Sequence, residues 1–279
     1  MIPPTPPVCA ERVNPATAMR KPTRNLVLLA VVTAALGAAV LAQVAHEHTW
    51  LQSRRLTDLD LQRIERLDIR CASCPTRRFQ RRGGSWHMLE PYPLPASAQA
   101  ISHLLAIAHA PVRSWSSMQA YDAARLGLSP PVISLTLNST RIDVGGEDPI
   151  EHDRYVRVGR RLARVPDRFS ARLFESPLNE LDRHLLAGDS NPTSVVVGDK
   201  PPDPTLIRAW RGAMAAGIRP ATTTAPATAI PIRIELAQGD SIRFDLFRNQ
   251  AGYVARRRKP ALDYLLDEAQ AQALLGKVR

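Results

Sequence analysis

Two cysteines separated by two residues are the feature of this sequence with the clearest chemical potential. Cys71 and Cys74 stand in the segment CASCP, where Pro75 follows them. This spacing favours a structural disulfide in an oxidising compartment. Thioredoxin-like chemistry normally places the first cysteine at a helix N-terminus, where the helix dipole lowers the pKa of the thiol; this pair lies between two predicted strands. We expect a structural disulfide, with a redox pair, a metal site and free thiols as alternatives.

Other residues that could do chemistry are isolated from one another. A structural zinc site needs four ligands, and His87 is the nearest candidate beside the cysteine pair. His46 and His48 could bind a metal, but a polar collar at the exit of a membrane span is the better interpretation. The tripeptide GDS occurs at 188–190 and 239–241, and both copies are typical of turns. The sequence therefore predicts no catalytic, cofactor-binding or metal-binding residue.

A long apolar window near the N-terminus predicts a membrane anchor. Residues 25–45 contain no charged side chain, and a helix of that length rises about 31 Å, close to the thickness of a bilayer's hydrocarbon core. An excess of basic residues on one flank keeps that flank in the cytoplasm, so we expect a single-pass protein with a cytoplasmic N-terminus. A signal peptide cleaved near Ala42 is the alternative. The preceding charges are Glu11, Arg12, Arg20, Lys21 and Arg24.

The chain is strongly basic. It has 37 Lys and Arg against 26 Asp and Glu, a formal net charge of +11. A basic protein often binds nucleic acid, but outside the cytoplasm the available polyanions are lipid head groups and envelope polysaccharides. We therefore expect no nucleic-acid partner and consider anionic lipid or polysaccharide as a partner. The alternative is that the arginines only solvate strand faces.

Periodicity predicts that the rest of the chain folds as repeated units. In residues 63–70 the pattern ends in the alternation of a half-buried strand. Gly83 and Gly84 then join two strands in a tight hairpin, and 96–111 carries an apolar stripe at helical spacing. The same order of strand, strand, strand and helix returns from residue 131 and again from residue 231. We expect an α+β fold with antiparallel sheets, built from three passes of one unit.

These patterns divide the chain into five segments. A basic cytoplasmic tail (1–24) and a transmembrane helix (25–45) precede a first periplasmic α+β lobe at 46–187. Residues 188–231 are rich in turn residues and in Thr, Ala and Pro, which predicts a linker with one short helix. Residues 232–279 form a C-terminal strand and helix unit.

Three short motifs mark the first lobe. They are a Trp after a glycine hairpin, a Gly-Leu-x-x-Pro turn before a strand, and a Tyr-Val strand that ends in Gly; their residues are Trp86, Gly127, Leu128, Pro130, Pro131, Tyr155, Val156 and Gly159. Together they resemble a widespread bacterial membrane-anchored family, the domain of unknown function 4340, over roughly residues 60 to 190. The family has no agreed reaction, and some members resemble auxiliary components of ATP-driven transport systems. The resemblance implies that these residues are structural and that the protein is an accessory.

The sequence thus predicts a non-catalytic protein of the bacterial inner membrane, whose periplasmic domain is an accessory or scaffold of an envelope system such as an ATP-driven transporter. We expect an envelope protein as its partner and no cofactor. One alternative is an envelope thiol–disulfide oxidoreductase that uses Cys71 and Cys74. The other is a basic module that binds a polyanion or a lipid surface.

Overall fold

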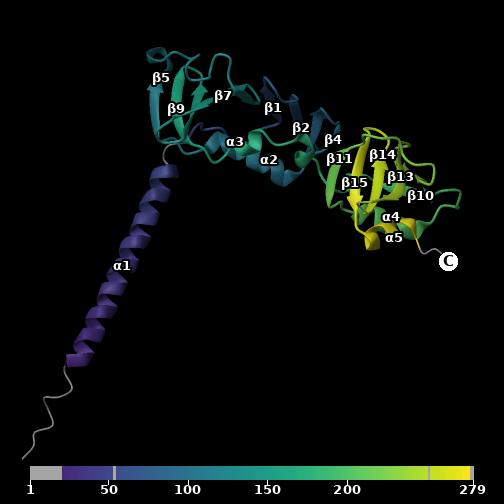
Figure 1. Ribbon diagram of the computed structural model, residues 1–279, viewed down its shortest axis with the longest axis horizontal. Helices are drawn as coiled ribbons and strands as arrows, with labels where there is room; N and C mark the ends of the chain where they lie inside the picture. Colours follow the sequence, from purple (N-terminus) through teal and green to yellow (C-terminus); the bar gives the residue numbers. More distant parts are fainter. Residues whose placement is uncertain (1–20, 53–54, 251, 277–279) are drawn as a thin grey trace, which may run out of the picture. The chain divides into compact units, whose positions relative to one another are not determined.

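The computed structural model of the chain describes residues 21–52, 55–250 and 252–276 (Figure 1). The chain divides into two units, Met1–Arg54 and Arg55–Arg279. Most of the predicted cytoplasmic tail lies outside the described residues, as do the side chains of His46 and His48.

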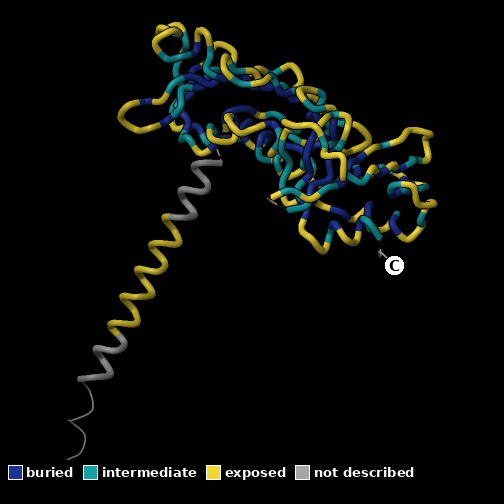
Figure 2. Tube along the Cα trace, turned by 45° about the vertical axis from the view of Figure 1, so that its right-hand side comes forward, coloured by how far each residue is buried: buried dark blue, intermediate teal, exposed yellow. Residues whose placement is uncertain are grey.

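The described part of the first unit is the helix α1 (Lys21–Gln52). Residues 28–43 of this helix are exposed throughout (Figure 2). Neither α1 nor any other helix in the described part of the chain combines the length and the apolar character that crossing a membrane requires.

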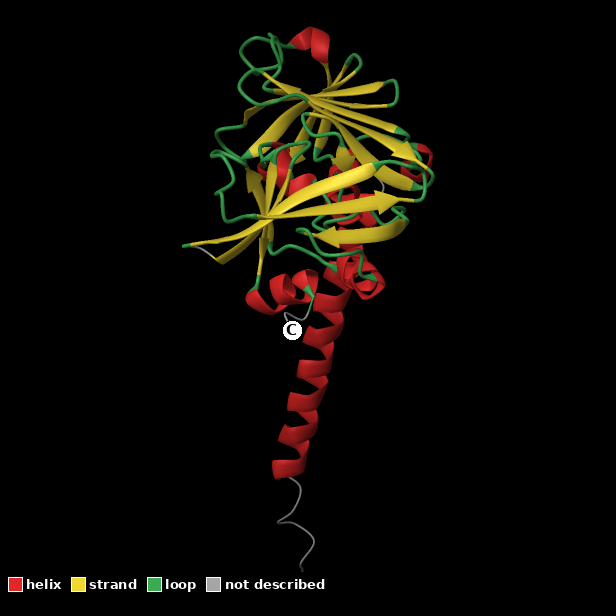
Figure 3. Ribbon diagram, turned by 90° about the vertical axis from the view of Figure 1, so that its right-hand side faces the viewer, coloured by secondary structure: helices red, strands yellow, loops and turns green. Residues whose placement is uncertain are grey.

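The second unit contains two antiparallel sheets with few helices, so the predicted α+β class is confirmed (Figure 3). The first sheet has nine strands in the order β4-β3-β2-β1-β6-β7-β8-β9-β5. Strand β1 is internal, because β2 pairs with one of its edges and β6 with the other. The strands are β1 (Arg66–Cys71), β2 (Arg77–Arg82), β3 (Ser85–Glu90), β4 (Leu94–Pro95), β5 (Ser114–Ser117), β6 (Ile133–Leu137), β7 (Thr140–Glu147), β8 (Asp153–Val158) and β9 (Arg161–Pro166).

The alternation of apolar and polar residues decides which face of the first sheet is buried. Leu67 and Ile69 of β1 are fully buried, whereas Arg66 and Arg70 are exposed. Successive side chains of a strand point to opposite faces. The sheet therefore has an inner apolar face and an outer polar face.

Two helices, α2 (Ala98–Leu105) and α3 (Ser170–Leu173), lie along the inner face (Figure 1). The Ser97 side chain caps α2 by accepting a hydrogen bond from the backbone N–H of Ala100. α2 buries Ile101 and Leu104 in the same core as Trp86 of β3. Short 3-10 turns complete this lobe: η1 (Leu61–Arg63), η2 (Ala106–His109), η3 (Met118–Ala120) and η4 (Pro177–Glu180).

Residues 126–131 cover part of the outer face, next to β7. The backbone N–H of Gly146 donates a hydrogen bond of 2.8 Å to the carbonyl oxygen of Leu126. A Cβ atom at Gly145 would clash with that same oxygen and with the side chain of Leu128, so glycine is needed for this close approach. Leu128 is fully buried in the contact.

The second sheet has six strands in the order β10-β12-β13-β14-β15-β11. Helix α4 (Pro204–Gly212) buries Trp210, whose indole N–H donates a hydrogen bond of 3.1 Å to the carbonyl oxygen of Leu274 in α5 (Glu268–Leu275). The strands are β10 (Pro192–Val197), β11 (Gly217–Pro220), β12 (Ile230–Leu236), β13 (Ser241–Asn249), β14 (Gly252–Arg257) and β15 (Leu262–Leu266).

The boundaries of this lobe differ from the prediction. Residues 188–231, expected to be a linker with one short helix, contain the helix α4 and also the strands β10 and β11 of the second sheet. The reason is that Val195 and Val197 of β10 are buried and pair with Ile234 and Ile232 of β12. The C-terminal unit therefore begins well before residue 232.

The structure also shows one strand arrangement twice, where we expected three passes. In each sheet four consecutive strands form a meander, β6 to β9 and β12 to β15. The strand just before each meander, β5 or β11, crosses to pair with the last strand of that meander. An earlier strand, β1 or β10, pairs with its first strand. The first sheet differs by the additional strands β2, β3 and β4.

Candidate functional site

The outer face of the first sheet brings polar side chains from four strands into one row. Arg70 of β1 lies opposite Ser134 of β6, Ser134 opposite Asp143 of β7, and Asp143 opposite Arg157 of β8. Directly paired residues in a sheet point to the same face, so the four side chains stand side by side, away from the apolar core.

Asp143 is the buried centre of this row. Its carboxylate accepts hydrogen bonds from Ser134 Oγ at 2.6 Å, Arg141 Nε at 2.7 Å and Arg157 Nη2 at 2.6 Å. Burial alone would raise the pKa of Asp143, but these hydrogen bonds outweigh it and hold the pKa below its ordinary value. The carboxylate is therefore ionised at neutral pH and fixes both guanidinium groups.

Two hollows lie on the outer face on either side of β1. The first, about 370 Å³ in volume, is lined by Asp68, Arg70, Cys71, Ala72, Pro130, Pro131, Ser134, Thr136 and Arg141. The second, about 340 Å³, is lined by Arg66, Asp68, Arg70, Arg78, Phe79, Gln80 and Leu89. Asp68 and Arg70 line both, so the two hollows adjoin. Their volumes fall in the lower part of the range found for small-ligand sites.

Of the three arginines that line the second hollow, one forms ion pairs with described residues and two do not. Arg78 Nε contacts Asp68 Oδ1 at 3.1 Å, and Arg78 Nη1 contacts Glu90 Oε1 at 3.2 Å. The guanidinium groups of Arg66 and Arg70 have no hydrogen-bond or ion-pair partner among the residues that the structure describes. Arg66 and Arg70 therefore give these hollows positive charge that no described acidic side chain compensates, and Asp68 is the one acidic residue that lines them.

The cysteine pair borders the first hollow. Cys71 is the last residue of β1, and the structure joins it to Cys74 in a disulfide with the Cα atoms 5.5 Å apart. The pair lies in the connection between β1 and β2, not at a helix N-terminus. Within the described residues, no group of three His, Cys, Asp or Glu side chains could hold a metal ion, and His87 belongs to β3.

The motif residues of the first lobe fall into two places. Trp86 is on the inner face, whereas Gly127, Leu128 and Pro130 belong to the segment that covers the outer face. Gly127 has a φ of +66°, and the chain turns at this residue. Pro130 and Pro131, which follow the turn, line the first hollow. Gly159, with a φ of +59°, turns between β8 and β9.

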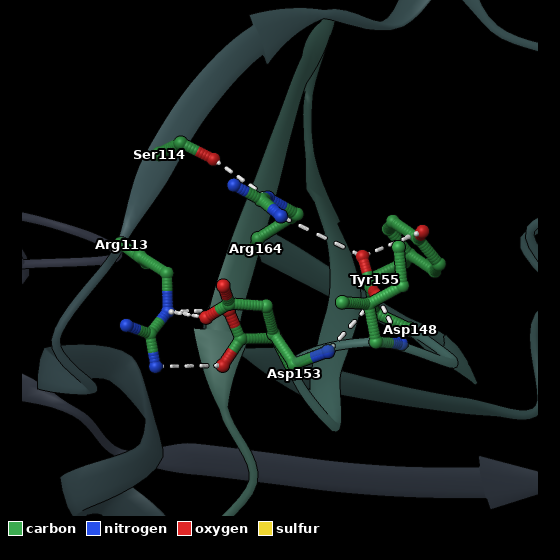
Figure 4. A network of polar contacts seen from close by, with 8 residues as sticks. Arg113, Ser114, Asp148, Asp153, Tyr155 and Arg164 are labelled. Carbon is green, nitrogen blue, oxygen red and sulfur yellow. Dashed lines mark hydrogen bonds and ion pairs between the residues drawn. The ribbon is translucent and has the colours of Figure 1, made fainter.

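Tyr155 belongs to a polar network at the other end of the outer face (Figure 4). Its hydroxyl donates a hydrogen bond of 3.1 Å to Asp148 Oδ2. Burial, followed by this hydrogen bond, raises the pKa of Tyr155. Arg113 Nε donates to Asp153 Oδ2 at 2.7 Å, and Arg164 Nε donates to Ser114 Oγ at 3.0 Å. The network ties the edge strand β5 to β8 and β9, which indicates a structural role.

A third cavity of about 550 Å³ contains an unusual buried carboxyl group. Glu180 contacts Arg77 Nη1 at 2.5 Å through Oε1, while its Oε2 has no hydrogen-bond partner among the described residues. Burial raises the pKa of Glu180 to about 7, against the attraction of Arg77. Arg77 also donates hydrogen bonds to the carbonyl oxygens of Leu173 and Glu175. The cavity also contains Asp182 and His184, whose carboxylate and Nδ1 lie 2.7 Å apart.

Neither the pair of Arg77 and Glu180 nor the Asp143 cluster was predicted from the sequence. The alternation in β2 could have predicted that Arg77 is buried, because Arg77 is two residues before Phe79 and therefore points to the same inner face. Nothing local distinguishes Glu180 or Asp143 from a solvated acidic residue, since their partners are remote in sequence or on another strand.

Comparisons with known proteins add no relative. No protein-family model, no curated protein and no solved structure matches the chain. The resemblance to the domain of unknown function 4340 therefore stays a prediction from the motifs.

Proposed function

We propose that this chain is a membrane-anchored accessory protein of a bacterial envelope system, held by α1, with its two-sheet unit in the periplasm as a binding or scaffold domain. The exposed apolar surface of α1 is the observation that carries the proposal. Seven large apolar residues of this helix are each at least 52 % exposed: Leu28, Leu29, Val31, Val32, Leu36, Val40 and Leu41.

Such a surface is unfavourable in water. Apolar area exposed to water costs about 25 cal/mol per Å² relative to an apolar environment, and lipid chains provide that environment on every side of a helix. The described side chains of this helix cover residues 28–43, fewer than a bilayer span requires. The uncharged window of the sequence covers 25–45, and basic residues precede it. These features support an anchor whose N-terminus faces the cytoplasm.

Two further features support a binding domain outside the cytoplasm. A disulfide between Cys71 and Cys74 persists in an oxidising compartment. The outer face of the first sheet presents ordered arginines and two adjoining hollows to the solvent. The finer architecture that we infer is a single membrane helix followed by two related α+β units, the first enlarged by three strands.

Membrane fractionation with a topology reporter tests the proposal. The full chain should remain in the membrane pellet after a carbonate wash, and alkaline phosphatase fused after Arg279 should be active. Leu36→Arg together with Val40→Arg should release the chain, because each charge costs about 3 kcal/mol at the centre of a membrane helix. The matched control is Ile150→Arg, at a loop position of the second unit that is 83 % exposed.

Release of the unaltered chain by carbonate, or an inactive phosphatase fusion, would refute the anchor. Recovery of a shortened soluble chain would instead show cleavage near Ala42.

A further inference from the structure

We propose that the two hollows on the outer face of the first sheet bind an anionic glycan, a sugar chain that carries carboxylate or phosphate groups. This names a ligand for the binding domain proposed above, but it does not depend on the membrane anchor. It rests on the charges, hydrogen-bonding groups and shape of the outer face.

The anionic groups of such a ligand find uncompensated positive charge. Arg66 and Arg70 are exposed, and no acidic side chain among the described residues pairs with them. They are on the same face of β1, four residues apart, which places their Cα atoms about 13 Å apart along the strand. Guanidinium groups bind carboxylates and phosphates through two parallel N–H donors.

The neighbouring cations are already arranged for a ligand. Arg141 and Arg157 are held by the buried carboxylate of Asp143, so their positions do not have to be ordered on binding. Preorganised groups lose less conformational entropy when a ligand arrives. Arg141 lines the first hollow, and its positive charge adds to that of Arg70.

The acceptors in the hollows select a sugar over a plain polyanion. Asp68 lines both hollows and repels an anion, but its carboxylate can accept hydrogen bonds from ligand hydroxyl groups. Thr136 in the first hollow and Gln80 in the second offer further hydrogen-bonding groups. Asp68 already accepts a hydrogen bond from Arg78 Nε, and it would repel the closely spaced anionic groups of a lipid phosphate surface or of an acidic peptide, which carry few hydroxyl groups. A glycan presents both anionic groups and hydroxyls.

The shape of the site fits a chain that crosses the strands. The two hollows share Asp68 and Arg70, so they form one track from β3 over β2 and β1 to β6. Three strand spacings span about 14 Å. Leu89, half-buried at one end of the track, and Pro130 and Pro131 at the other give apolar surface for sugar rings.

Binding by the purified full chain in detergent micelles tests this proposal with four probes. Fluorescent oligogalacturonate and a phosphorylated mannan carry both anionic groups and hydroxyls. Neutral dextran carries hydroxyls alone, and polyglutamate carries carboxylates alone. We expect at least one of the anionic glycans to bind, with dextran and polyglutamate each about tenfold weaker or more. Failure of both anionic glycans to bind, or polyglutamate binding as tightly as they do, overturns the proposal.

Variants locate the binding on the outer face. Arg70→Gln should weaken glycan binding by about tenfold or more, as expected for the loss of a charged hydrogen bond. The control Arg211→Gln removes an exposed arginine of α4 and should leave binding unchanged. Asp68→Ala should also weaken binding of the glycan. A gain of affinity in Asp68→Ala, or equal losses in Arg70→Gln and Arg211→Gln, would show attraction to net positive charge and refute the site.

Different results refute the membrane anchor and the glycan site. Loss of membrane retention in the α1 variants concerns the proposed function alone, because the binding assay uses detergent-solubilised protein. Glycan binding that is insensitive to Arg70 concerns the site alone.

Discussion

Replacement of Glu180 by Gln should remove a loss of stability that the unaltered protein undergoes as pH rises through neutrality. The pKa of Glu180 is raised from 4.5 to about 7 by burial, although Arg77 attracts its charge. An acid with a raised folded-state pKa holds its proton more tightly in the folded chain than in the unfolded chain. Its contribution to stability is therefore complete below the unfolded-state pKa and is lost as pH rises through the folded-state value.

The size of the effect follows from the shift. One pKa unit corresponds to about 1.4 kcal/mol, so the difference between 4.5 and about 7 corresponds to about 3 kcal/mol of unfolding free energy. Most of this loss should occur between about pH 5 and about pH 8. Glu180→Gln resembles the protonated side chain at every pH and should lack this loss. Relative to the unaltered protein, the variant should therefore gain about 2 to 3 kcal/mol over that interval.

Urea unfolding followed by tryptophan fluorescence, at a series of pH values, measures both free energies. Glu90→Gln is the matched control, because Glu90 forms an exposed ion pair with Arg78 and such pairs contribute about 1 kcal/mol or less. The alternative explanation, in which the ion pair with Arg77 outweighs burial, predicts the opposite result. If the ion pair with Arg77 dominates, Glu180→Gln should be destabilised by about 3 to 5 kcal/mol at pH 8, and that result would refute desolvation as the main influence on Glu180.

Three further variants test the fold, and a fourth serves as a control. Trp86→Ala should lower the free energy of unfolding by about 3 to 5 kcal/mol, because Trp86 is buried in the inner core; an unchanged melting temperature would contradict that placement. Replacement of both Cys71 and Cys74 by Ser should cost only about 1 to 2 kcal/mol, since the disulfide closes a small loop, and should leave cellular function intact; mass spectrometry of alkylated protein with and without reduction checks the bond. Gly145→Ala should cost more than about 2 kcal/mol because the new Cβ would clash with the covering segment. Gly188→Ala, where a Cβ meets nothing within 4 Å, should leave the melting temperature nearly unchanged.

Sequence patterns predicted the strands, helix and turn whose conformation depends on residues close by in the chain. Alternation around Leu67 and Ile69 located β1, and the helical stripe of Ile101 and Leu104 located α2. Glycines at 83 and 84 marked the β2 to β3 hairpin, where both adopt positive φ. Each of these features depends on neighbours within a few residues, which a sequence pattern contains.

Pairing between remote strands was not predictable in the same way. The strands β10 and β11 were assigned to a linker, because turn residues flank β10 and a tract of Thr, Ala and Pro follows β11. β10 pairs with β12 and β11 pairs with β15, and the spacing of apolar residues within each strand does not reveal these partners. The candidate site was missed for a related reason. Arg70, Ser134 and Asp143 come from three strands, so only the register of the sheet brings them together.

The crossing strands have a consequence for the order of assembly during synthesis. Strand β5 precedes β6 to β9 in the chain but pairs with β9 alone, so it has no partner until the whole meander has emerged. Strand β1 likewise keeps one edge open until β6 arrives. Such non-local pairings slow folding, because loops must close before the contacts form. We expect the first sheet to close only after Pro166 has been made, and the second sheet to wait in the same way for Leu266.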